Sequence, residues 1–181
     1  MKGVDGRQQV VGAAEAVLQA AVIAEGAEIR LDGRIDEEIW LTATPITDFT
    51  QQEPVEGATP SHPTEIRVLF DADALYIGAI VYDDPEGVLA YQRQRDAGLG
   101  TDDRFMWILD TFRDGRTGYF FEINAAGLMG DGILGGGGGG GGSNKAWDGI
   151  WEARTAMRPD GWSAEIRIPF RTLNFDPDLD T

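Results

Sequence analysis

The sequence predicts an all-β fold, an antiparallel two-sheet β-sandwich with a short N-terminal helix. Apolar and polar residues alternate over several short segments, and turn-forming residues separate these segments at regular intervals. Little helical periodicity lies between them. With 181 residues, of which 42% are hydrophobic, the chain is long and apolar enough for one domain with a sizeable core. These observations favour a single sandwich domain over a disordered chain.

The N-terminal helix is expected over residues 8–23. Apolar side chains recur there at the spacing of one helical face: Val10, Ala14, Val17, Leu18, Ala21 and Val22. Charged residues interrupt the start of the chain and no continuous apolar run follows, so we find no signal-peptide pattern. We therefore divide the chain into a helical extension, residues 1–25, and a sandwich domain, residues 26–181.

The sandwich domain is expected to begin with a short strand and a short helix. Residues 27–33, AEIRLDG, have the pattern of a strand. Residues 34–43, RIDEEIWLTA, have the pattern of a helix, with Asp36 placed to cap its first turn. Ile39 and Trp40 would then face inward.

A β-hairpin follows. Apolar residues alternate with charged ones over residues 64–70, residues 71–74 form the turn, and a second apolar run covers residues 75–82. The alternation predicts a hairpin with one buried face.

Four further strands are predicted from the same alternation, at residues 103–112, 117–124, 149–157 and 161–170. Turn-forming sequences lie between them at residues 113–116, 125–127 and 158–161. The residues expected on their inner faces are Phe105, Trp107 and Leu109; Tyr119, Phe121 and Ile123; Trp151, Ala153, Thr155 and Met157; and Trp162, Ala164, Ile166 and Ile168. Core packing is therefore the expected role of Trp40, Trp107, Trp151 and Trp162.

Eight consecutive glycines at residues 135–142 stand apart from the rest of the chain. Such a run orders itself only at a high entropic cost, and it has the composition of an artificial loop that joins two strands. It does not continue into the G-K-[ST] sequence of a phosphate-binding loop, so we exclude that function.

Charge and composition exclude several classes of function. The formal net charge is −16, which repels phosphate backbones and anionic lipids and favours cations or neutral ligands. The absence of cysteine excludes disulfides, thiolate catalysis and cysteine zinc sites, and the single histidine, His62, is too few for a His-rich metal site. No segment approaches the length of about 20 apolar residues that a membrane-spanning helix needs.

Four motifs support a resemblance to a known family: IRLDGRIDEEIW, TEIRVLFDADALYIGAIVYDD, DDRFMWILDTFRDGRTGYFFEINAAG and WDGIWEARTAMRPDGWSAEIRIPFRTLNF. In this order and spacing, over residues 28–176, they resemble the family 9-like carbohydrate-binding domain of certain bacterial outer-membrane-associated proteins. The resemblance implies a jelly-roll-like sandwich, a sugar held by tryptophans, and structural calcium. It also implies an exported parent protein, in the periplasm, the outer membrane or at the cell surface. Met106 and Glu122 stand where the family has a sugar-contacting acid and arginine.

The candidate ligand-binding residues are those whose side chains are expected to be exposed. Trp147 lies beside a predicted loop without apolar alternation around it, so its ring could stack on the face of a sugar, or pack at the rim of the core. Tyr119 and Tyr91 are further candidate stacking rings. Asp148 and Asn124 are candidates for hydrogen bonds to sugar hydroxyl groups.

Acidic residues at the predicted strand ends are candidate calcium ligands, because calcium prefers carboxylate and carbonyl oxygens. We take Asp102, Asp103 and Asp131 as the candidate ligands. No D-x-[DN]-x-[DN]-G loop is present, and solvated turns are the alternative role of these acids.

The function that these observations favour is non-catalytic carbohydrate binding, with calcium stiffening the loops. A glycosidase pair would need a cleft that raises one carboxyl pKa, whereas these acids lie in predicted turns. A parent protein of this family could still be classed as a hydrolase.

The alternative function is that of a structural or interaction domain of a larger outer-membrane protein, without a small-molecule ligand. A haem-binding variant using Met129 and Lys145 is a further alternative, without a spacing motif to support it. The sequence does not set the oligomeric state.

Overall fold

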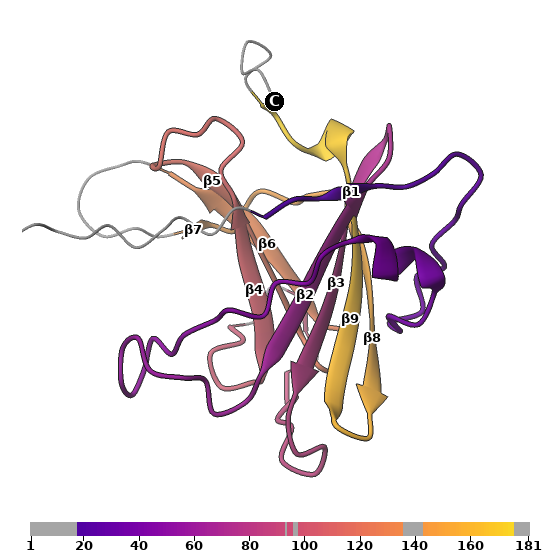
Figure 1. The fold of residues 1–181 in the computed structure, drawn as a ribbon. Coiled ribbons are helices and arrows are strands. Elements are labelled where there is room, and N and C mark those ends of the chain that lie inside the picture. The colour runs from indigo at the N-terminus through magenta and orange to yellow at the C-terminus, as the bar shows by residue number, and fades with distance from the viewer. Residues whose placement is uncertain (1–17, 93, 96–97, 136–142, 176–181) are drawn as a thin grey trace, which may run out of the picture.

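The computed structural model describes residues 18–92, 94–95, 98–135 and 143–175. In them the chain forms a five-stranded sheet in the order β1-β2-β3-β9-β8 and a four-stranded sheet in the order β4-β5-β6-β7. The strands are β1 (Ala21–Val22), β2 (Thr64–Phe70), β3 (Ala74–Tyr82), β4 (Arg104–Leu109), β5 (Gly118–Asn124), β6 (Met129–Leu134), β7 (Ser143–Asn144), β8 (Glu152–Arg158) and β9 (Gly161–Pro169). Figure 1 shows the two sheets as two layers. The predicted β-sandwich is confirmed.

The predicted hairpins form where turn residues can supply the local hydrogen bonds. Between β2 and β3, Asp71 Oδ1 accepts the N–H groups of Asp73 and Ala74, both at 2.8 Å. All strand neighbours pair antiparallel except β1 and β2, which are parallel. The central pair β3 and β9 runs in register from Ala74 opposite Pro169 to Tyr82 opposite Gly161.

The core lies between the two sheets and is rich in aromatic rings. The buried side chains that form it include Val68, Ile77, Phe105, Tyr119, Phe121, Ile123, Trp151, Ala153, Trp162, Ala164, Ile166 and Ile168. The predicted core role of Trp151 and Trp162 is confirmed. Met157, predicted on the same face as Trp151, is 54% exposed, because β8 is the edge strand of its sheet and Met157 lies toward its end.

The N-terminal part of the chain departs from the predictions. Residues 8–17 of the expected helix lie outside the described residues, and the remaining residues, 18–23, are not helical. Ala21–Val22 instead pairs with β2, and the Ile23 N–H group donates to Phe70 O at 2.8 Å. The open edge of β2 offers these backbone groups partners, which outweighs a weak helical preference.

The segment that follows was also predicted only in part. Residues 27–33 form no strand, and the helical segment is the short 3₁₀ helix η1 (Glu38–Thr42). Asp36 does not cap it, because Glu37 occupies the cap position and no side chain donates or accepts a cap hydrogen bond. Trp40 does turn inward and is buried.

This N-terminal segment covers the outer face of the five-stranded sheet, so β3 is buried on both faces and not on one as predicted (Figure 1). Trp40 and Ala43 pack there against Leu69, Ala74 and Tyr76. Gly78 makes the close approach possible, since a Cβ atom at that position would lie 2.9 Å from the Ile35 and Trp40 side chains.

A buried carboxylate anchors this segment. Glu165, in the middle of β9, is 0% exposed. It accepts the N–H groups of Asp32 at 2.7 Å and Gly33 at 2.8 Å, and the Trp40 Nε1–H group at 3.2 Å. Ser163 Oγ donates to Gly33 O at 2.6 Å. Side chains from a central strand thus satisfy the backbone of an irregular segment.

Besides β1, two further strands were missed from the sequence. β6 contains two glycines and lacks apolar alternation, and β7 is only two residues long. The glycine run connects these two paired strands, and its residues 136–142 lie outside the described residues.

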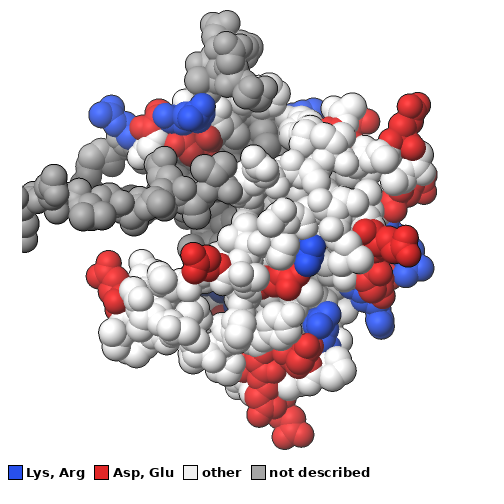
Figure 2. Space-filling model, in the orientation of Figure 1, with Lys and Arg blue, Asp and Glu red and all other residues white. Residues whose placement is uncertain are grey.

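The surface carries the acidic excess unevenly. Figure 2 shows acidic side chains along the right and lower margins of one face and a broad uncharged area over its upper centre. Within the described part of the chain, no helix is long and apolar enough to cross a membrane.

We expect Glu165 to make stability depend on pH in one direction. Burial raises the pKa of its carboxyl group, although the N–H groups of Asp32 and Gly33 oppose this. A raised folded-state pKa adds stability below the unfolded-state pKa, and this contribution is lost as pH rises through the folded-state value. The unfolding free energy of the wild type minus that of Glu165→Gln should therefore fall as pH rises above the ordinary glutamate pKa of about 4.3. Denaturant titrations measure it, and a difference that stays constant or grows with pH contradicts this role.

Gly33 and Gly26 form a matched pair that tests the docking of the segment. Both have positive φ, +89° and +83°, but a Cβ atom at Gly33 would lie 2.5 Å from the Thr155 carbonyl carbon, whereas Gly26 faces open space. Gly26→Ala should cost about 1 kcal/mol of unfolding free energy from backbone strain. Gly33→Ala should lower the unfolding free energy by at least about 2 kcal/mol more than Gly26→Ala does, because backbone atoms at Gly33 or Thr155 must move to make room for the new Cβ atom. Equal costs in chemical denaturation would show that the segment is not held against β8.

Candidate functional site

The segment that joins β7 to β8, residues 145–151, carries Trp147. The Trp147 ring is partly buried. Its centroid lies 4.9 Å from that of Tyr119 and 6.0 Å from that of Phe121. Gly149 lies so close that a Cβ atom there would be 2.6 Å from Trp147 Cη2. Trp147 therefore sits at the rim of the core, with part of its surface accessible.

A buried carboxylate holds this segment in place. Asp131, on β6, is 1% exposed, and its Oδ2 atom accepts the Trp151 Nε1–H group at 2.6 Å and the Gly149 N–H group at 3.2 Å. The same oxygen receives a hydrogen bond from Arg95 Nη2 at 3.1 Å. One acid thereby fixes the segment, a core tryptophan and an arginine from a different loop.

Arg95 also reaches the surface beside Trp147. Its Nη2 atom donates to Asp148 Oδ1 at 2.7 Å, and the Asp148 side chain is 81% exposed. We call Trp147, Asp148 and Arg95 the Trp147 rim. It places an accessible indole next to a guanidinium donor and a carboxylate acceptor, which are the groups that orient a polar ligand over an apolar surface.

The rings behind the rim form a continuous stack that supports it. Phe105 and Trp107 are stacked at 4.9 Å, and Trp107 and Phe121 at 5.4 Å. Trp151 meets Phe121 edge-on at 5.3 Å. Such packing keeps the residues under Trp147 rigid.

Two predicted ligand residues have structural roles instead, which corrects their assignment. Tyr119 is buried beneath Trp147 and its hydroxyl oxygen accepts the Asn174 N–H group at 2.9 Å, so its ring offers no open face. Asn124 is also buried, and its Oδ1 atom accepts the N–H groups of Ala126 and Leu128 in the turn before β6. Alternation alone does not distinguish a buried polar residue from an exposed one.

Tyr91 is 69% exposed, as predicted for a stacking ring. Among the described residues, however, it makes no ring contact with Trp147 and no hydrogen bond to Asp148. The structure therefore does not bring it into the Trp147 rim.

The three predicted calcium ligands are not brought together. Asp102 Oδ2 accepts the Gln92 N–H group and the Asn124 Nδ2–H group, both at 2.9 Å. Burial would raise the pKa of Asp102, but these donors outweigh it and lower the pKa. Asp103 Oδ2 accepts the Leu89 N–H group at 2.6 Å, and Asp131 is engaged as described above. No group of three or more acidic or histidine side chains in the described part of the chain is arranged to hold a metal ion.

Sequence reasoning missed Arg95, since nothing local predicts a contact with Asp131 and Asp148, which lie 36 and 53 positions away. It also missed the environment of Glu122 on the outer face of β5. Glu122 is buried and pairs with Arg104 at 2.7 Å and Lys145 at 3.1 Å. Gly130 opposite it leaves the space, as a Cβ atom there would lie 3.0 Å from Glu122 Oε1.

Comparison with protein-family models finds no match, and none of the curated proteins matches either. Solved structures do match. A family 9 carbohydrate-binding module from Caldicellulosiruptor kristjanssonii in complex with glucose is 20% identical over 90% of this chain and 73% of that chain, with a TM-score of 0.57. Its complex with cellotriose gives 19% identity, 83% and 67% coverage and a TM-score of 0.55.

A protein from Bacteroides uniformis ATCC 8492, whose name proposes carbohydrate binding, is 14% identical over 84% of this chain and 72% of that chain, with a TM-score of 0.60. At these identities the likeness shows the fold. The predicted family 9-like sandwich is confirmed at that level.

Asp131 and Asp148 bind the same arginine, and they provide a matched test of what holds the rim. Asp131→Ala leaves the buried Trp151 and Gly149 donors without an acceptor, so we expect the unfolding free energy to fall by about 3 kcal/mol. Asp148→Ala removes only an exposed ion pair and should cost less than about 1 kcal/mol. Denaturant titration measures both. Similar costs for the two variants would mean that Asp131 does not anchor the segment.

Proposed function

We propose that this protein is a non-catalytic carbohydrate-binding module that binds a neutral sugar at the Trp147 rim. The observation that carries the proposal is the exposed Arg95–Asp148 pair, joined at 2.7 Å beside a partly accessible indole. The module from C. kristjanssonii, which has this fold, is solved with glucose and with cellotriose.

The two charged groups supply the polar half of recognition. Asp148 can accept hydrogen bonds from sugar hydroxyl groups, and Arg95 can donate to their oxygens. Because Asp131 fixes Arg95 from below, the guanidinium group is already ordered before a sugar arrives. Pre-organisation of this kind reduces the entropic cost of binding.

Trp147 supplies the apolar half. Covering about 80–100 Å² of an indole by the C–H face of a pyranose contributes about 2 kcal/mol, which alone gives no better than millimolar affinity. Hydrogen bonds to charged groups are worth about 1.5–3 kcal/mol each, so the affinity depends on Asp148 and Arg95 together with Trp147. A neutral sugar also avoids repulsion by the net charge of −16.

The acids elsewhere in the fold support a non-catalytic role. Asp114 accepts the N–H groups of Arg116 and Thr117 at 2.7 Å each, and these bonds lower its pKa. Glu165 has a raised pKa but is enclosed by Gly33 and Trp40, so it cannot meet a substrate. A glycosidase acid needs both a raised pKa and access to the substrate.

Calcium binding stays a prediction, and the described residues offer no ligand set for it. The export of a parent protein also stays a prediction.

We expect isothermal titration with cellotriose to give a dissociation constant in about the millimolar range, accompanied by a change in tryptophan fluorescence. Asp148→Ala should weaken binding about tenfold, since one charge-assisted hydrogen bond is lost. Asp160→Ala is the control, because Asp160 forms an exposed pair with Arg158 at 2.9 Å outside the rim.

Trp147→Phe should weaken binding less than Trp147→Ala, since a smaller ring is kept. Equal affinity of the Asp148→Ala and Asp160→Ala variants would place the sugar elsewhere. No binding of neutral sugars by the wild type would contradict the proposal and favour the structural-domain alternative.

A further inference from the structure

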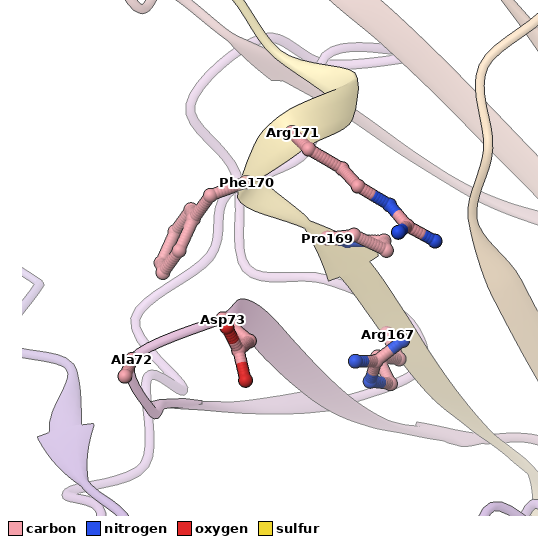
Figure 3. A pocket seen from close by; sticks show the side chains of 6 residues that line it. All are labelled: Ala72, Asp73, Arg167, Pro169, Phe170 and Arg171. Atoms are coloured by element: carbon pink, nitrogen blue, oxygen red, sulfur yellow. The ribbon is translucent and has the colours of Figure 1, made fainter.

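A concave site, separate from the Trp147 rim, lies where β9 ends and β3 begins. It has a volume of about 440 Å³ and is lined by Ala72, Asp73, Arg167, Pro169, Phe170 and Arg171. We call it the arginine pocket. Figure 3 shows Arg167 and Arg171 on one side of Asp73, with Phe170 and Ala72 on the other.

Backbone hydrogen bonds hold the walls of this pocket together. The Phe170 N–H group donates to Asp73 O at 2.8 Å, which joins the β2–β3 turn to the end of β9. Asp71 Oδ1 accepts the N–H groups of Asp73 and Ala74, so the turn itself is fixed. The pocket is therefore formed before any ligand binds.

The two arginines differ in what they contact. Arg167 donates from Nε to Tyr76 Oη at 3.2 Å, and its Nη1 atom lies 3.5 Å from Glu152 Oε1. These contacts orient its guanidinium group and leave Nη2 without a partner among the described residues. Arg171 is exposed and makes no hydrogen bond or ion pair within the described part of the chain.

The chemistry of the lining selects a ligand class. Two guanidinium groups on one side suit a carboxylate, which they can hold through paired N–H donors. Asp73 can accept hydrogen bonds from hydroxyl groups, and Phe170 with Pro169 offers an apolar surface. A bare inorganic anion would face the Asp73 charge and leave Phe170 unused, and a neutral sugar would leave Arg171 unused.

We propose that the arginine pocket binds a single uronic acid residue, with its carboxylate on Arg167 and Arg171 and its hydroxyl groups on Asp73. A terminal uronate is favoured over a polyuronate, because a net charge of −16 repels a chain of negative charges. This inference goes beyond the proposed function and uses a separate site. Residues 172–174 run between the two sites. The Thr172 hydroxyl group forms hydrogen bonds with the backbone of Ile150, and the Asn174 N–H group donates to the Tyr119 hydroxyl oxygen.

The test is an NMR titration of the ¹⁵N-labelled chain with methyl glucuronoside, methyl glucoside and acetate. The glucuronoside should shift the backbone amide signals of Asp73, Phe170 and Arg171. Arg171→Gln should weaken its binding about tenfold, and Arg171→Glu should weaken it further, since a charge-assisted hydrogen bond is lost and then replaced by repulsion. Arg34→Gln is the matched control, because Arg34 is an exposed arginine outside the pocket.

The inference would be overturned if glucuronoside caused no shift at the pocket, or if glucuronoside bound no more tightly than glucoside or acetate. Equal affinity of the Arg171→Gln and Arg34→Gln variants for glucuronoside would overturn it as well. Shifts confined to Asp148 and Gly149 would place the uronate at the Trp147 rim and also overturn it. Cellotriose titrated into the Arg171→Gln variant reports on the rim alone, so failure of one site is distinguishable from failure of the other.

Discussion

Two buried carboxylates, each of which accepts an indole N–H group, hold irregular segments of the chain against the sheets of this sandwich. Glu165 receives Trp40 Nε1–H together with two backbone N–H groups of the N-terminal segment. Asp131 receives Trp151 Nε1–H together with the Gly149 N–H group and Arg95. A buried carboxylate is costly unless donors satisfy it, so each acid strongly favours the one arrangement that supplies them. The rest of the structure depends on this pairing.

The sequence was sufficient to predict the parts of the fold that rest on local pattern. Strands β2, β3, β4, β5, β8 and β9 follow from alternation, and the core positions of Trp151 and Trp162 follow with them. β6 was missed because its pairing comes from its neighbours and not from its own glycine-containing sequence. The end of the expected N-terminal helix became β1 because the edge of β2 offered backbone partners.

The candidate site was less predictable, because its contacts join distant segments. Trp147 and Asp148 could be proposed as ligand-binding residues from their place beside a loop. The role of Arg95, in contrast, depends on its contacts with Asp131 and Asp148, which form only in the folded chain. Polar residues expected at a ligand, such as Asn124, proved to be buried hydrogen-bonding groups. The two proposed binding sites share one property, which is that hydrogen bonds within the protein orient one arginine of each site beforehand: Arg95 through Asp131 and Arg167 through Tyr76.

The most direct test of this account is hydrogen exchange of the indole N–H groups, observed by ¹H–¹⁵N NMR. If Asp131 and Glu165 bind the Trp151 and Trp40 indoles as described, these two signals should exchange with solvent much more slowly than that of Trp147 at the rim. Exchange of the Trp40 and Trp151 signals as fast as that of Trp147 would contradict the anchoring that the fold and the Trp147 rim require.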